Sequence, residues 1–98
     1  MKIKSIAILG AGSMGAQIAA ECANAGFLCV LYDLKHTKAD PNKRVKIALD
    51  NLLKANPKVL TSNSNINLIK SANFEDDLNL LKNMDLIIGE VNYLIKPL

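Results

Sequence analysis

The chain has 98 residues, which is enough for one domain. Half of the residues are hydrophobic but only 4% are aromatic, so we expect an aliphatic α/β core and no aromatic stacking surface for single-stranded nucleic acid. The net charge of +3 comes from lysines spread along the chain, which indicates a solvated surface and no nucleic-acid-binding face. No apolar run is long enough to span a membrane, and the first one is too short for a signal peptide. We therefore expect a cytoplasmic protein that binds neither nucleic acid nor membrane.

The chain begins with a predicted strand–helix–strand unit. Residues 3–9 are almost continuously apolar, which is typical of a parallel strand covered on both faces. A glycine-rich hexapeptide, GAGSMG at 10–15, follows directly and leads into a helix from about 13 to 25, with Gly26 as its stop. Residues 27–32 are rich in β-prone side chains and predict the second strand.

Each glycine of the hexapeptide has its own predicted purpose. Gly10 permits a tight turn off the strand, Gly12 lets a diphosphate approach the backbone, and Gly15 lets the helix pack closely on the sheet. The unpaired N–H groups of the first helical turn would then face the phosphates, at the positive end of the helix dipole. The sequence thus predicts a dinucleotide-binding βαβ unit.

Asp33 ends the second strand and is the predicted ribose ligand. It lies 18 residues beyond Gly15, close to the separation of about 20 at which the ribose-binding acid follows such a loop. A carboxylate there accepts hydrogen bonds from the 2′-hydroxyl and repels a 2′-phosphate, which favours NAD over NADP. Lys35 and Lys38 would partly offset that repulsion. The alternative is a solvated acid at a strand end.

The second half of the chain continues the alternation. A helix is predicted from Asp40, as N-cap, with Pro41 as its first residue, to about Asn56. Apolar residues recur there at i, i+3, i+4, i+7 and i+8 from position 45, so one face is expected to pack on the sheet. A polar loop at 61–65, a third strand at 66–71 and a fourth at 84–88 complete the pattern.

Neither the acidic residues nor the cysteines indicate a metal site. Asn73 is predicted to cap a short helix, and the acids at 75–77 suit the positive end of that helix. Cys22 and Cys29 are neither a CxxC pair nor at metal-ligand spacing, so they are expected to be buried free thiols.

The predicted fold is the N-terminal half of a Rossmann fold, in the α/β class. Right-handed crossovers place about four parallel strands in the order 3-2-1-4. A ligand crevice is expected where the order reverses, between the carboxyl ends of the first and fourth strands. The glycine loop and residues 89–91 would both face it.

Several segments resemble the L-3-hydroxyacyl-CoA dehydrogenase family. They are IAILGAGSMGAQIA at 6–19, VLYD at 30–33, NFEDDL at 73–78 and DLII at 85–88. The regions around 56–58 and 74–77 are similar to long multidomain members. The resemblance implies NAD-dependent oxidation of a 3-hydroxyacyl-CoA to the 3-ketoacyl-CoA in fatty-acid β-oxidation.

The resemblance also implies which residues hold the cofactor. Residues of the loop and first helical turn would approach the diphosphate, Asp33 would hold the ribose, and Glu90 would stand for the first acid of a segment that follows the fourth strand in the family. That segment is shorter here, and Lys96 would correspond to the lysine at its end in the family. The full predicted set is Gly10, Gly12, Ser13, Met14, Gly15, Asp33 and Glu90.

No catalytic residue is expected in this chain. The family's His–Glu pair and its substrate-contacting Ser and Asn lie further along than the chain reaches, and His36 falls beside the adenosine end. We therefore expect residues 1–98 to form one cofactor-binding domain that is truncated after the fourth strand and inactive alone. The open edge of that strand would expose unpaired backbone groups that can pair with other chains or aggregate. We therefore predict that a protein partner or a second copy covers this edge.

Two other functions stay open on the sequence alone. The chain could be a non-catalytic NAD(H)-sensing module that acts through a population shift. It could also be half of another dinucleotide-dependent oxidoreductase, FAD-binding or of the 6-phosphogluconate-dehydrogenase type. Cofactor preference distinguishes these alternatives.

Overall fold

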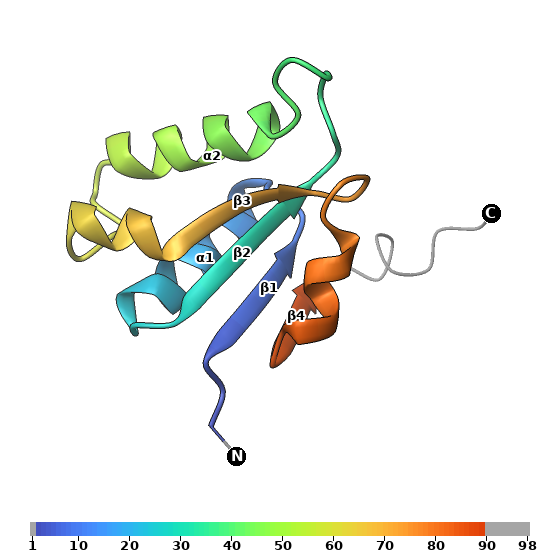
Figure 1. The fold of residues 1–98 in the computed structure, drawn as a ribbon. Helices are drawn as coiled ribbons and strands as arrows, with labels where there is room; N and C mark the ends of the chain where they lie inside the picture. Colours follow the sequence, from blue (N-terminus) through green and yellow to red (C-terminus); the bar gives the residue numbers. More distant parts are fainter. Residues whose placement is uncertain (1, 90–98) are drawn as a thin grey trace.

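Within the part of the chain that the structure describes, four parallel strands form one sheet, and their order confirms the predicted 3-2-1-4 topology. The computed structural model describes residues 2–89 (Figure 1). The elements in chain order are β1 Ser5–Leu9, α1 Ser13–Asn24, β2 Leu28–Asp33, α2 Lys43–Lys54, the 3-10 helix η1 Asn63–Leu68, β3 Ile69–Asn73, the 3-10 helix η2 Leu78–Asn83 and β4 Leu86–Gly89.

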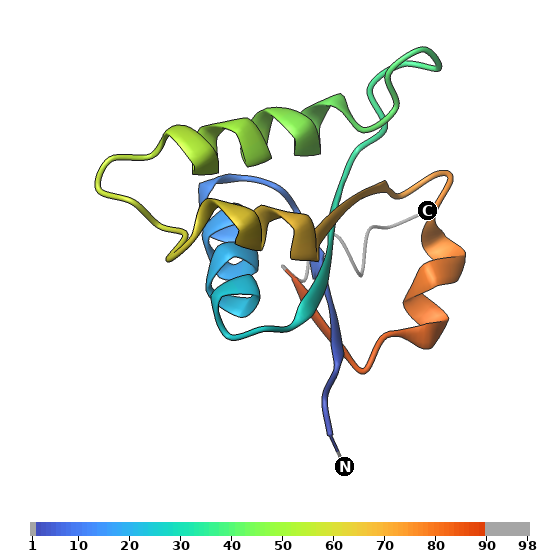
Figure 2. The ribbon, with the colours of Figure 1, turned by 60° about the vertical axis from the view of Figure 1, so that its left-hand side comes forward.

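The sheet is covered on its two faces by different segments, as Figures 1 and 2 show. Alternate side chains of β1 point to opposite faces. Ile6 and Ile8 belong to a buried cluster with α1 and α2, whereas Ala7 and Leu9 pack with side chains of η2. All four are nearly inaccessible to solvent, which explains why β1 is apolar throughout.

Tyr32 anchors the η2 side of the sheet. Its side chain is fully buried, and its hydroxyl donates a hydrogen bond to the Asp77 carbonyl at 2.8 Å. Its ring stacks on Phe74, with 5.6 Å between the ring centroids. These contacts fix the segment after β3 to the end of β2.

The predicted start of the second helix is wrong. The helix begins at Lys43 with Asn42 as N-cap, and Asp40 and Pro41 lie in the turn before it. There the Asp40 N–H donates to the Thr37 hydroxyl at 3.0 Å, and the Asp40 carboxylate pairs with Lys46 at 3.1 Å. The side chain that was predicted to cap the helix is thus used elsewhere.

The third strand starts three residues later than predicted and ends two later. Residues 63–68 are 3-10 helical, and the side-chain amide of Asn65 ties this segment to the side chains of Asn24 and Thr61, to each of which it donates at 3.0 Å. Asn73 is the last residue of β3, and its side-chain oxygen accepts from the N–H groups of Glu75 and Asp76. Asn73 therefore caps a turn, and the following helix begins only at Leu78.

The other boundaries differ from the predictions by one or two residues. β1 begins at Ser5, β2 spans Leu28–Asp33 and β4 spans Leu86–Gly89. The start of β1 is fixed by Asp85, whose carboxylate accepts hydrogen bonds from the N–H groups of Lys4 at 2.8 Å and Ser5 at 3.1 Å. These contacts join the beginning of β1 to the beginning of β4.

The hydrogen bonds to Asp85 predict an acid-sensitive contribution to stability. They lower the pKa of this carboxyl, so its contribution is present above the ordinary aspartate value of about 3.9 and is lost as the pH falls through the lowered pKa. We expect Asp85→Asn to lower the melting temperature by a few degrees at pH 7. The difference from the wild-type chain should shrink as the pH falls from 7 to below about 3.9. A difference that stayed constant over this range would contradict the assignment.

Both cysteines are free. Cys29 is completely buried, with its thiol 3.8 Å from the Ala19 carbonyl, and burial raises its pKa to about 12. Cys22 on α1 is half-buried, and burial raises its pKa as well. Both thiols are therefore protonated at neutral pH and act as small apolar side chains of the core.

Within residues 2–89, the edge of β4 away from β1 has no paired strand. Leu86 and Ile87 are 39% and 42% exposed there. That a protein partner or second copy covers this edge stays a prediction. In the described part of the chain, no helix has the length and apolar character needed to cross a membrane.

Candidate dinucleotide-binding site

The loop between β1 and α1 turns sharply at Gly10. Its φ of +108° lies in a region of backbone conformation that residues with a Cβ rarely adopt. Its N–H donates to the Tyr32 carbonyl at 2.8 Å, which keeps the turn beside the end of β2. The chain then enters α1 with Gly12 as N-cap.

Gly12 and Gly15 differ in what an added Cβ atom would contact. A Cβ on Gly15 would collide with the Gly10 carbonyl oxygen, so this glycine is needed for the loop to pack against α1. A Cβ on Gly12 would meet no protein atom within 4 Å. The protein therefore leaves open the space beside Gly12, where a ligand could approach the backbone.

The first turn of α1 offers unpaired N–H groups. The first hydrogen bond of the helix runs from the Ala16 N–H to the Gly12 carbonyl at 2.9 Å. Among residues 2–89, the N–H groups of Ser13, Met14 and Gly15 have no acceptor, because the helix has no side-chain cap. The first turn carries no acidic residue either, so the positive end of the helix dipole is not neutralised. This arrangement suits an anion.

A cavity of about 400 Å³ lies over this helix end, at the carboxyl ends of β1 and β4. It occupies the predicted switch point of the sheet. Its lining is Ile8, Leu9, Gly10, Gly12, Ser13, Met14, Gly15, Ile18, Ile88 and Gly89. Apolar walls with a few convergent backbone donors are typical of a cofactor site.

Asp33 lies beside the loop. One carboxylate oxygen accepts from the Ala11 N–H at 2.8 Å and the other from the Leu34 N–H at 2.6 Å. The side chain is half-buried. The structure thus brings Asp33 next to the glycine loop, although the sequence did not predict its bond to Ala11.

The remaining sequence predictions lie away from the cavity or outside the described residues. Glu90 is outside residues 2–89. His36 is exposed in the loop after β2, and its N–H donates to the Pro41 carbonyl at 3.1 Å. In the described range, no three His, Cys, Asp or Glu side chains are grouped so that they could hold a metal ion.

The NAD-binding domain family of 3-hydroxyacyl-CoA dehydrogenase matches residues 5–93. The chain belongs to this family. Membership confirms the resemblance seen in the sequence, and NAD is the cofactor of this family of domains.

Curated relatives agree with this assignment. A probable 3-hydroxyacyl-CoA dehydrogenase from Deinococcus radiodurans is 44% identical over 92 residues, which are 93% of this chain and 27% of the relative. A putative fatty acid oxidation complex trifunctional enzyme from Rickettsia felis is 41% identical over 88 residues, which are 89% of this chain and 12% of the relative. The chain thus spans about a quarter or less of the relatives' length.

Solved structures of the family share the fold. (S)-3-Hydroxybutyryl-CoA dehydrogenase from Ralstonia eutropha is 31% identical, with a TM-score of 0.58, and the match covers 91% of this chain and 31% of that one. The 3-hydroxybutyryl-CoA dehydrogenase of Escherichia coli has a TM-score of 0.66 over 91% of this chain and 19% of its own, at 23% identity. The second likeness supports the Rossmann-type fold alone.

Proposed function

We propose that this chain binds NAD(H) through its glycine loop as the cofactor-binding part of a 3-hydroxyacyl-CoA dehydrogenase. The observation that carries the proposal lies beneath the cavity at the switch point: the N–H groups of Ser13, Met14 and Gly15 have no acceptor among residues 2–89. Two diphosphate oxygens beside these groups would accept hydrogen bonds from them, and the helix dipole would stabilise the negative charge of the diphosphate. The open space at Gly12 lets the diphosphate come close to the backbone.

Asp33 is the proposed ribose ligand. Its carboxylate is fixed at the loop by two backbone donors, and a carboxylate has further lone pairs for the two ribose hydroxyls. Bound NAD⁺ supplies the hydride acceptor for oxidation of a hydroxyl group. The residues of this chain bind and orient that cofactor, while Glu90 is proposed to contribute beyond β4.

The whole activity is proposed from the relatives. Their names support oxidation of 3-hydroxyacyl-CoA to 3-ketoacyl-CoA in fatty-acid oxidation. A proton acceptor is needed as the hydride leaves, and the single histidine of this chain is exposed in the loop after β2. We therefore propose that residues 1–98 bind the cofactor without turnover by themselves. The two free thiols favour a reducing compartment, so we propose a cytoplasmic location.

Calorimetry with NAD⁺, NADH, NADP⁺ and FAD tests the proposed function. The 98-residue chain is expected to bind NAD⁺ or NADH with a dissociation constant in about the micromolar to millimolar range, and more tightly than NADP⁺ or FAD. The same sample mixed with 3-hydroxybutyryl-CoA and NAD⁺ should show no growth of NADH absorbance. Tighter binding of FAD or NADP⁺, in a chain shown to be folded by circular dichroism, would contradict the proposal.

A further inference from the structure

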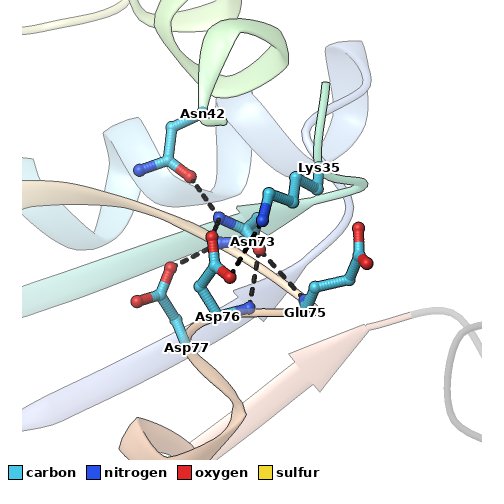
Figure 3. Close-up of polar contacts among 6 residues, drawn as sticks. All are labelled: Lys35, Asn42, Asn73, Glu75, Asp76 and Asp77. Atoms are coloured by element: carbon cyan, nitrogen blue, oxygen red, sulfur yellow. Dashed lines mark hydrogen bonds and ion pairs between the residues drawn. The ribbon is translucent and has the colours of Figure 1, made fainter. Parts of the chain in front are cut away.

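A polar network joins the ends of β2 and β3, as Figure 3 shows. The Lys35 ammonium lies 3.1 Å from one carboxylate oxygen of Asp76. The Lys35 side chain is only 22% exposed and that of Asp76 is 46% exposed. The lysine is therefore packed along the protein surface toward Asp76 and does not extend freely into solvent.

Asn73 holds Asp76 in place. It is 1% exposed, and its side-chain oxygen accepts from the Asp76 N–H at 2.8 Å and the Glu75 N–H at 3.0 Å. Its amide group donates to the Asp76 carboxylate at 3.1 Å and to the Asn42 side chain at 2.9 Å. A buried amide with four partners fixes the turn, and the turn fixes the carboxylate that pairs with Lys35.

Asp33 is the last residue of β2 and Lys35 follows two residues later, but their side chains bond on opposite sides of the strand. Asp33 bonds to Ala11, which follows β1, whereas Lys35 bonds to Asp76, which follows β3. Since β2 lies between β1 and β3, the ammonium is directed away from the glycine loop. The lysine that would offset repulsion of a 2′-phosphate is instead paired with Asp76.

We infer that Asp76 is a positioning residue for cofactor choice: it holds Lys35 away from the ribose site and so preserves discrimination against NADP. This inference rests on the proposed NAD-binding function and names a specificity determinant outside the glycine loop. While the pair is intact, the Lys35 ammonium is bound to Asp76 and does not neutralise a 2′-phosphate next to Asp33. Once released, Lys35 is two residues from Asp33 and can neutralise that phosphate.

The expected effect is modest, because the pair is partly exposed. Such a pair shifts an equilibrium by about fivefold or less. Asp76→Asn keeps an oxygen for the Asn73 amide but removes the charge that holds Lys35. We expect NADP⁺ to bind the variant about three- to fivefold more tightly, with NAD⁺ affinity almost unchanged.

A double-mutant cycle on the full 98-residue chain provides the test, with NAD⁺ and NADP⁺ dissociation constants as the readout. In Asp76→Asn/Lys35→Gln, the gain in NADP⁺ affinity should disappear, whereas Lys35→Gln alone should change neither constant appreciably. Asp40→Asn is the matched control, because it breaks an exposed lysine pair of the same 3.1 Å length at the start of α2. It should leave the ratio of the two constants unchanged.

The outcomes separate this inference from the function it rests on. An unchanged ratio in Asp76→Asn, or a changed ratio that persists in the double variant, overturns the positioning of Lys35 while NAD⁺ binding stands. Failure of the folded wild-type chain to bind NAD⁺ overturns both. Melting curves of all variants check that altered affinity does not come from unfolding.

Discussion

Replacing Gly15 with alanine is expected to weaken the fold and remove NAD binding together. The new methyl group would collide with the Gly10 carbonyl oxygen, a backbone atom that no side-chain rotation can move. Either the turn at Gly10 or the start of α1 must shift. Overpacking of this kind costs about 1–3 kcal/mol, which lowers the melting temperature of a domain of this size by about 4–8 °C per kcal/mol. The displaced loop also misplaces the N–H groups meant for the diphosphate.

Gly12→Ala separates binding from stability. Gly12 has φ −67° and ψ −179°, which alanine adopts without strain, and its Cβ would meet no protein atom within 4 Å. Alanine stabilises the folded state because it lowers the entropy of the unfolded chain, but it is a poorer N-cap than glycine. These two effects nearly cancel, so stability should change by less than about 1 kcal/mol. The methyl group occupies the space where the diphosphate is proposed to lie. We expect NAD⁺ affinity to fall about tenfold or more.

Thermal melting and calorimetry on the two variants check this contrast. Gly15→Ala should show a lower melting temperature and no detectable NAD⁺ binding, and Gly12→Ala a nearly normal melting temperature with weak binding. Normal binding by Gly12→Ala would place the diphosphate elsewhere. A stable Gly15→Ala chain would show that the loop relaxes around the methyl group more easily than its geometry suggests.

The strand order was predictable because each step depended on local patterns. Apolar runs predicted the strands, the hexapeptide fixed the first helix, and the handedness of crossovers set the order. The predicted start of the third strand failed where a side chain bonds to a distant part of the chain. Asn65 bonds to Asn24, 41 residues away in sequence, and it lies in the 3-10 segment Asn63–Leu68, which occupies the first three positions of the predicted strand. No local pattern reveals such a bond.

The candidate site was predictable to the level of residue types but not of contacts. The glycine positions and Asp33 follow from spacing alone, whereas the bond from Ala11 to Asp33 requires knowing how closely the loop approaches β2. The pairing of Lys35 with Asp76 could have been inferred once β2 and β3 were placed side by side. Their carboxyl ends meet at one edge of the sheet, so polar residues that follow both strands become neighbours.

Asp33→Asn is expected to lower NAD⁺ affinity by about tenfold or more and to remove most discrimination against NADP⁺. A hydrogen bond to a charged group contributes about 1.5–3 kcal/mol, which corresponds to about a 10- to 100-fold change in affinity. The amide loses the charge that strengthens bonds to the ribose hydroxyls, and it no longer repels a 2′-phosphate. NADP⁺ affinity should therefore change much less than NAD⁺ affinity.

The asparagine variant also distinguishes two roles of Asp33, which are binding the ribose and holding the glycine loop. Its side-chain oxygen can still accept from the Ala11 N–H, which Asp33 contacts at 2.8 Å, so the loop should stay in place and the melting temperature should change little. Asp33→Ala removes that acceptor as well, and we expect it to lower both stability and affinity. Asp50→Asn, at an exposed position on α2, is the control for a lost negative charge. If Asp33→Asn kept the preference of the wild-type chain for NAD⁺, the role of Asp33 would be limited to holding the loop. Cofactor choice would then have to come from other residues.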